Sequence, residues 1–251
     1  LPLKEKLFKL RDPAFRQRLL TETPEVENNP FLRQAHKRYH DMYVMSEEPD
    51  YEPLPSTSIE AQALKQNKHP LELCLDILTR GDGKEMIYYA FLNYGESSLN
   101  PAKEMMEHPN TILGLGDGGA HCGSICDGSF TTHMLTHWTR DRSRGEKLEL
   151  PWVVKAHCQD TAAAVGLNDR GILAPGYKAD INIIDLGKMR LKKPEVHYDL
   201  PAGGRRLMQF ADGYVATLVS GVPIYLNGES TGARPGRLVR GSQPKPNLRN
   251  Y

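Results

Sequence analysis

Apolar residues recur every three or four positions through most of the first 80 residues, with charged residues between them. This spacing places the apolar side chains on one face of a helix and predicts short amphipathic helices. Four are expected, at residues 2–10, 12–20, 56–66 and 69–80. Asp12 is suited to the N-cap of the second helix, with Pro13 in its first turn. The proline-rich segment 47–58 predicts an extended loop between the two pairs.

Beyond these helices, short apolar runs alternate with helical patterns. Residues 85–92 are rich in aromatic and β-favouring types, residues 100–108 begin with a helix-starting Asn-Pro pair, and residues 111–116 form a short apolar run. This strand, helix, strand order predicts a parallel sheet with crossover helices, as in α/β proteins. Two further helices are expected, over 129–142 and 151–166.

The last third of the chain carries the signals of β-hairpins. A turn is expected at Pro175 and Gly176, followed by a strand. Residues 214–228 predict two strands about a tight Gly-Val-Pro connection at 221–223. No internal repeat or low-complexity tract interrupts the chain.

Composition narrows the range of partners. The 251 residues include 32 Lys and Arg against 31 Asp and Glu, a net charge of +1 with no long run of one sign. This argues against a nucleic-acid partner and favours small molecules or proteins. No stretch is long and apolar enough to span a membrane, and the start lacks a signal peptide's apolar core. A soluble, cytoplasmic chain with free thiols at its four irregularly spaced cysteines is expected.

The strongest candidate for catalytic chemistry is Asp117, which directly follows the apolar run at 111–116. In α/β sheets and barrels, functional side chains gather where parallel strands end. Glycines at 116, 118 and 119 would let a substrate or a metal approach the backbone closely. An Asp-Gly turn in which Asp117 is only a capping residue explains the same pattern.

Two sets of possible metal ligands lie nearby. His121, Cys122 and Cys126 have the nitrogen and thiolate donors that zinc prefers, but a closed site needs a fourth ligand and no second cluster follows. Buried thiols explain the cysteines more simply. His133 and His137 are four apart on an expected helix, yet they lack the glutamate of a His-Glu-x-x-His motif. Two half-exposed histidines on a helix are therefore the favoured interpretation.

Three segments together resemble a known family. They are "GLGDGGAH" at 114–121, "LTHWTRDR" at 135–142 and "GLNDRGILAPGYKADINIID" at 166–185. They resemble the C-terminal half of the amidohydrolase superfamily, and more closely its N-acyl-D-amino-acid deacylase (D-aminoacylase) branch. The resemblance is clearest over 93–240.

The resemblance implies a division of the chain into three regions. Residues 1–92 would be a helical insertion and a segment flanking the barrel. Residues 93–165 would form the C-terminal strands and helices of a (β/α)8, TIM-like barrel, and residues 166–251 a small β-sandwich domain with the tail.

The resemblance also implies roles for the candidate residues. Asp117 would touch the catalytic metal, expected to be zinc, and act as general base for a metal-bound water. A carboxylate near a cation stays ionised, as a base must. His121, four positions after Asp117, is a candidate to hydrogen-bond the substrate or Asp117, an expectation that rests on its place in the same loop and not on the resemblance. The remaining ligands of the superfamily, including its His-x-His pair, have no counterpart in this sequence. A fragment of a longer enzyme, inactive alone, is therefore expected.

The sequence thus predicts a metal-dependent hydrolase of carbon-nitrogen bonds other than peptide bonds, acting on a small-molecule substrate. Deacylation of an N-acyl-D-amino acid is the first hypothesis. A cyclic amide hydrolase of the dihydroorotase or hydantoinase kind would use the same aspartate. A non-catalytic scaffold that keeps the amidohydrolase fold is the alternative from another class.

Overall fold

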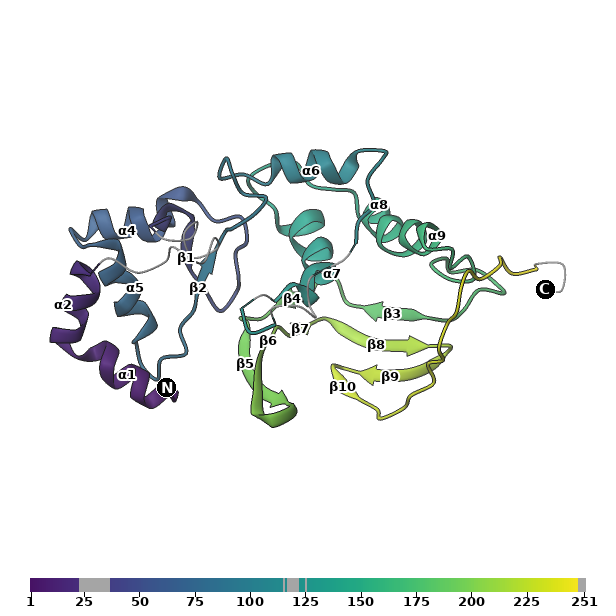
Figure 1. The fold of residues 1–251 in the computed structure, drawn as a ribbon. Helices are drawn as coiled ribbons and strands as arrows, with labels where there is room; N and C mark the ends of the chain where they lie inside the picture. The colour runs from purple at the N-terminus through teal and green to yellow at the C-terminus, as the bar shows by residue number, and fades with distance from the viewer. Residues whose placement is uncertain (23–36, 115, 117–121, 125, 248–251) are drawn as a thin grey trace. The chain divides into compact units, whose positions relative to one another are not determined.

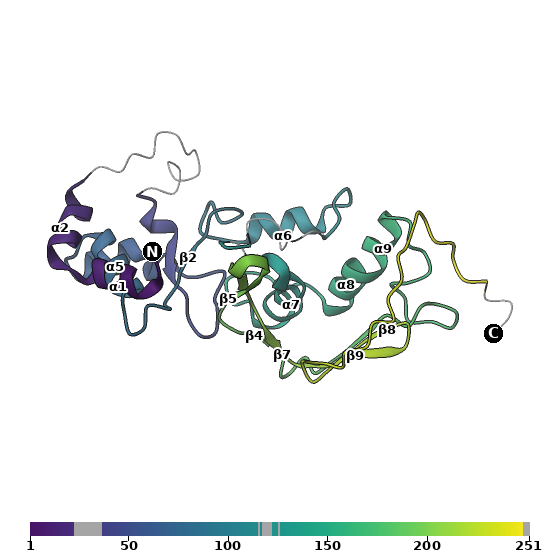
Figure 2. The same ribbon diagram turned by 60° about the horizontal axis from the view of Figure 1, so that its bottom comes forward.

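The computed structural model describes residues 1–22, 37–114, 116, 122–124 and 126–247. The chain divides into two compact units, Leu1–Pro101 and Ala102–Tyr251. Helices predominate in the first unit, whereas the second combines helices with most of the strands (Figures 1 and 2). The mixture of helices and strands is consistent with the expected α/β class.

The predicted helices of the first unit are confirmed. They are α1 (Leu3–Arg11), α2 (Pro13–Thr21), α4 (Ile59–Lys65) and α5 (Pro70–Leu78). Asp12 caps α2, since its carboxylate accepts the backbone N–H of Ala14 at 3.0 Å. The Ser58 hydroxyl caps α4 by accepting the N–H of Ala61 at 3.2 Å. Local side-chain chemistry therefore fixes where both helices begin.

A small sheet and an apolar core complete the first unit. Strands β1 (Met42–Val44) and β2 (Ile87–Tyr89) pair antiparallel. The 3-10 turn η1 (Tyr39–Asp41) directly precedes β1, and a second 3-10 turn, η2 (Pro55–Thr57), lies between the two strands in the chain. The core cluster lies on α4 and α5 and comprises Ile59, Ala63, Leu73, Cys74 and Ile77. Burial raises the pKa of the Cys74 thiol to about 11, so this cysteine is protonated at neutral pH.

The helices predicted beyond residue 100 are also confirmed. Their bounds are α6 (Asn100–Glu107), η3 (Asp127–Ser129), α7 (Phe130–His133), η4 (Met134–Asp141), α8 (Leu150–Lys155), η5 (Ala156–Asp160) and α9 (Thr161–Ala164). The segments η4 and η5 have π-helical winding. In η4 the hydroxyls of Thr136 and Thr139 donate to carbonyls four residues back, at 3.0 and 2.6 Å. Such back-bonding competes with backbone hydrogen bonds and distorts helices.

The strands of the second unit form antiparallel pairs. They are β3 (Ile181–Ile184), β4 (Arg190–Leu191), β5 (Glu195–Leu200), β6 (Gly204–Met208), β7 (Ala211–Asp212), β8 (Tyr214–Val219), β9 (Val222–Leu226) and β10 (Glu229–Ser230), with the 3-10 turn η6 (Pro201–Gly203) between β5 and β6. One sheet has the order β10-β9-β8-β3, and β4-β7 and β5-β6 form two-stranded sheets (Figure 1).

Two details of the prediction are wrong. Residues 111–114 and 116 form no strand, and every pairing between the named strands in the described part of the chain is antiparallel, so no parallel sheet or closed barrel is present there. A strand needs a partner for its backbone groups, and no pairing strand is found for residues 111–114 or 116 among the described residues. The hairpin turn lies at Ser220 and Gly221, because both adopt positive φ (51° and 78°), as a two-residue turn between twisted strands requires. Pro223 cannot adopt positive φ and belongs to β9.

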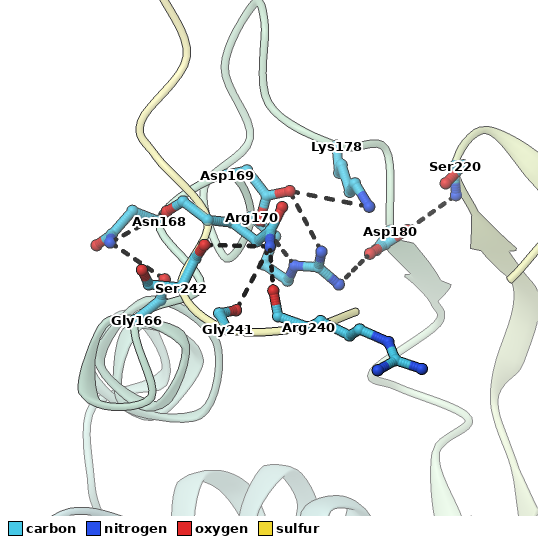
Figure 3. A network of polar contacts seen from close by, with 11 residues as sticks. Gly166, Asn168, Asp169, Arg170, Lys178, Asp180, Ser220, Arg240, Gly241 and Ser242 are labelled. Atoms are coloured by element: carbon cyan, nitrogen blue, oxygen red, sulfur yellow. Dashed lines mark hydrogen bonds and ion pairs between the residues drawn. The ribbon is translucent and has the colours of Figure 1, made fainter. Parts of the chain in front are cut away.

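The segment at 166–185 is held by a polar network (Figure 3). The Arg170 guanidinium lies 3.0 Å from the Asp169 carboxylate and 3.4 Å from that of Asp180. Asp180 also accepts the backbone N–H of Ser220 at 2.8 Å, which joins the start of β3 to the β8–β9 turn. The Arg170 hydrogen bond lowers the pKa of Asp169, so this carboxylate is ionised at neutral pH. Asp169, Arg170 and Asp180 therefore have a structural role in holding this segment together.

Candidate functional site

The two residues predicted for catalysis and substrate contact, Asp117 and His121, lie outside the described residues. Their flanks are described and belong to the second unit. A Cβ atom at Gly116 would lie 2.7 Å from the Asp127 carbonyl oxygen and 2.9 Å from the Phe130 ring, so only glycine fits there. On the other side, the N–H of Leu207 donates to the Cys122 carbonyl at 2.6 Å.

Phe130 and His157 form a contact beside Gly116. The ring centroids lie 5.7 Å apart. Nε2 of His157 is buried and has no hydrogen-bond partner among the described residues. Burial lowers the pKa of this imidazole, so it is neutral at pH 7. A neutral imidazole can accept or donate one proton, which makes His157 a functional candidate that the sequence pattern did not reveal.

The lowered pKa of His157 predicts that the stability of the protein depends on pH. On unfolding, the imidazole regains an ordinary pKa near about 6.5. At a pH between the lowered folded pKa and the ordinary unfolded pKa, the unfolded chain binds more protons than the folded chain. The stability contributed by neutral His157 is therefore complete above the unfolded pKa and falls as the pH drops. Urea unfolding at pH 7 and pH 5 should show a smaller loss in His157→Gln than in the wild type. Equal losses in both proteins would contradict the assignment.

His133 and His137 stack on each other. Their ring centroids lie 4.7 Å apart with an interplanar angle of 10°. Residues four apart share one face of a helix, which lets the two rings stack. Phe130 lies on the same helix face, three positions before His133. Both histidines are half-buried, in agreement with the favoured interpretation.

The helix that carries these histidines is anchored beyond them. The Trp138 ring is buried and lies 5.5 Å, edge to face, from the His137 ring. The guanidinium carbon of Arg142 lies 4.6 Å from the Trp138 centroid, a cation–π contact with a buried arginine. Arg142 also donates to the Glu146 carbonyl at 2.7 Å. These contacts fix the face that presents His137.

The expected metal ligands do not form a donor set in the described part of the chain. No group of three or more His, Cys, Asp or Glu residues could hold a metal ion there. Cys122 and Cys126 are half-buried free thiols, and burial, followed by the nearby Asp127 charge, raises the pKa of Cys126. The described residues therefore supply no complete zinc site, and Asp117 and His121 are not among them.

The comparisons assign the chain to a family. In the second unit Gly116 lies against Asp127 and Phe130, and the Cys122 carbonyl accepts the N–H of Leu207 on β6, within a chain that mixes helices and strands. The sequence model of the amidohydrolase family matches residues 2–225, so the chain belongs to that family. No curated protein and no solved structure matches it significantly. Among the described residues, no helix has the length and apolar composition needed to cross a membrane.

Proposed function

We propose that this chain acts in a metal-dependent hydrolase of carbon-nitrogen bonds other than peptide bonds. The bond cleaved is the amide bond of an N-acyl-D-amino acid. The observation that carries the proposal is the family match over residues 2–225. The D-aminoacylase branch is supported by the motifs at 114–121 and 166–185 that resemble it. A small-molecule substrate also agrees with the balanced charge of the chain.

In this proposal Asp117 is the general base. Its carboxylate takes a proton from the water that attacks the amide carbonyl and passes it to the leaving nitrogen. Gly116 supports the role, because its close packing against Asp127 and Phe130 fixes the chain just before the aspartate. His121 would contact the substrate from the same loop.

Zinc is the metal proposed for the active site, as the family is generally metal-dependent. The described residues supply no set of three ligands, so the ligands besides Asp117 would come from elsewhere in the protein. The proposed role of this chain in the reaction is the proton transfer by Asp117.

A substrate panel tests the proposal. The full-length protein is expected to release acetate from N-acetyl-D-leucine at least about tenfold faster than from the L enantiomer. Dialysis against a chelator should abolish the activity, and added zinc should restore it. Hydrolysis of dihydroorotate or hydantoin in place of N-acetyl-D-leucine would favour the cyclic amide alternative. Absence of hydrolysis across the panel with zinc present would favour a scaffold.

A further inference from the structure

The first unit contains a cavity that includes none of the predicted site residues. It has a volume of 560 Å³ and is bordered by β1, β2, α4, α5 and residues 45–57. Cavities of about 300–1,000 Å³ are typical of sites for small organic ligands. The cavity is therefore large enough to hold a small molecule.

One part of the cavity wall is apolar and aromatic. Tyr43, Leu73 and Ile77 line it and are buried. Tyr88 completes this wall, with its ring 6.4 Å from the Tyr43 ring and 5.3 Å from that of Tyr51. Burial raises the pKa of Tyr88, so its phenol is neutral at physiological pH. This wall suits the apolar body of a ligand.

Asp76, one of four charged residues in the lining, is already paired within the protein. Its carboxylate lies 2.8 Å from Nζ of Lys68 and also pairs with Arg16. Burial raises the pKa of Asp76, but the hydrogen bonds from Lys68 and Arg16 outweigh it, so the pKa is lowered overall. Both oxygens of Asp76 are therefore engaged within the protein, one by Lys68 and one by Arg16.

The two other charged lining residues, Asp50 and Arg80, have no ion pair with another side chain in the described ranges. One oxygen of Asp50 accepts the backbone N–H of Glu52 at 2.9 Å, which leaves the second oxygen for a ligand. Arg80 follows the C-terminal end of α5. The cavity thus offers one cation and one anion beside an apolar wall.

We propose that this cavity binds a zwitterionic amino acid with a large apolar side chain. The guanidinium of Arg80 binds the carboxylate, a pairing that planar two-point hydrogen bonding favours. Asp50 binds the ammonium group, and the side chain packs against Tyr88 and Ile77. A ligand with only one charge would leave either Asp50 or Arg80 unmatched. The site is independent of the proposed catalytic role of Asp117.

Three related probes test this charge requirement by titration calorimetry. Phenylalanine carries both charges, N-acetylphenylalanine lacks the ammonium group, and 2-phenylethylamine lacks the carboxylate. The Asp117→Asn background prevents the hydrolysis proposed above. Phenylalanine is expected to bind at least about tenfold more tightly than either analogue. No saturable binding of phenylalanine, or equal affinity for all three, would overturn the proposal.

Charge-removing variants assign each end of the ligand. Arg80→Gln should weaken phenylalanine binding about tenfold and leave 2-phenylethylamine unchanged, whereas Asp50→Asn should weaken phenylalanine and leave N-acetylphenylalanine unchanged. Both residues are exposed, so the fold should tolerate the changes. Lys84→Gln, an exposed position outside the cavity, is the matched control and should bind like the parent. The proposal is overturned if Arg80→Gln and Asp50→Asn both match this control. Because Asp117 plays no part here, failure of the proposed hydrolysis would leave these results unchanged.

Discussion

Replacing Asp117 by Asn is expected to lower the kcat for amide hydrolysis by the full-length protein by about 10² to 10⁴-fold. The amide side chain has nearly the shape of the carboxylate but cannot take the proton of the attacking water. If the aspartate acts only on that proton, KM should change little while kcat falls. The measurement is steady-state hydrolysis of N-acetyl-D-leucine across pH 5 to 9, with zinc added at saturation.

The matched control is Asp82→Asn. Asp82 is exposed and pairs with Lys84 at 2.8 Å, an interaction that contributes little at a protein surface. This variant should hydrolyse at the wild-type rate and follow the same pH profile. A wild-type rate in Asp117→Asn would instead assign this aspartate to a turn, the structural alternative that its Asp-Gly sequence leaves open.

The parts of the fold that could be predicted from sequence are those with local causes. Asp12 marks a helix start because its carboxylate oxygen, two residues away, satisfies a free backbone N–H. Gly166 ends the helical region because it adopts a positive φ of 75° there. In each case the residue that decides and the backbone group that responds are neighbours in the chain.

The prediction failed where a distant partner decides. Residues 111–114 have the composition of a strand, but a strand forms only where another strand pairs with it. Apolar runs in parallel sheets and those in irregular segments look alike in sequence. The hairpin turn was misplaced by one residue for a different reason, since the Ser220-Gly221 pair is itself a turn signal and was passed over for the Gly-Val-Pro sequence that follows.

The candidate site divides in the same way. Asp117 could be selected from its glycine neighbours, and its role stays a prediction because it lies outside the described residues. The four-residue spacing of His133 and His137 indicated a shared helix face. The contact between Phe130 and His157, 27 positions apart, has no local signal. Likewise, Asp50 and Arg80 line one cavity only because the loop and α5 meet in space.

The substitution Gly213→Ala is expected to destabilise the protein by about 3 kcal/mol or more. Gly213 has a φ of +95°, and a Cβ atom there would lie 2.5 Å from Cα and 2.8 Å from the backbone nitrogen of Met189. Met189 is buried, and its backbone cannot yield as a flexible side chain would. The carbonyl of Gly213 also accepts the N–H of Asp185 at 2.8 Å, so a shift would strain that bond.

Gly228→Ala separates the steric clash from the backbone strain. Gly228 has a similar φ of +84°, but nothing lies within 4 Å of the position of its Cβ atom. Its substitution should therefore cost only the strain of left-handed backbone, about 1 to 2 kcal/mol. Urea unfolding of both variants measures the difference in unfolding free energy. Equal destabilisation of the two variants would mean that the Met189 contact contributes nothing. A clearly larger loss of unfolding free energy in Gly213→Ala would assign the difference to the close packing of Gly213, between β7 and β8, against Met189, which precedes β4.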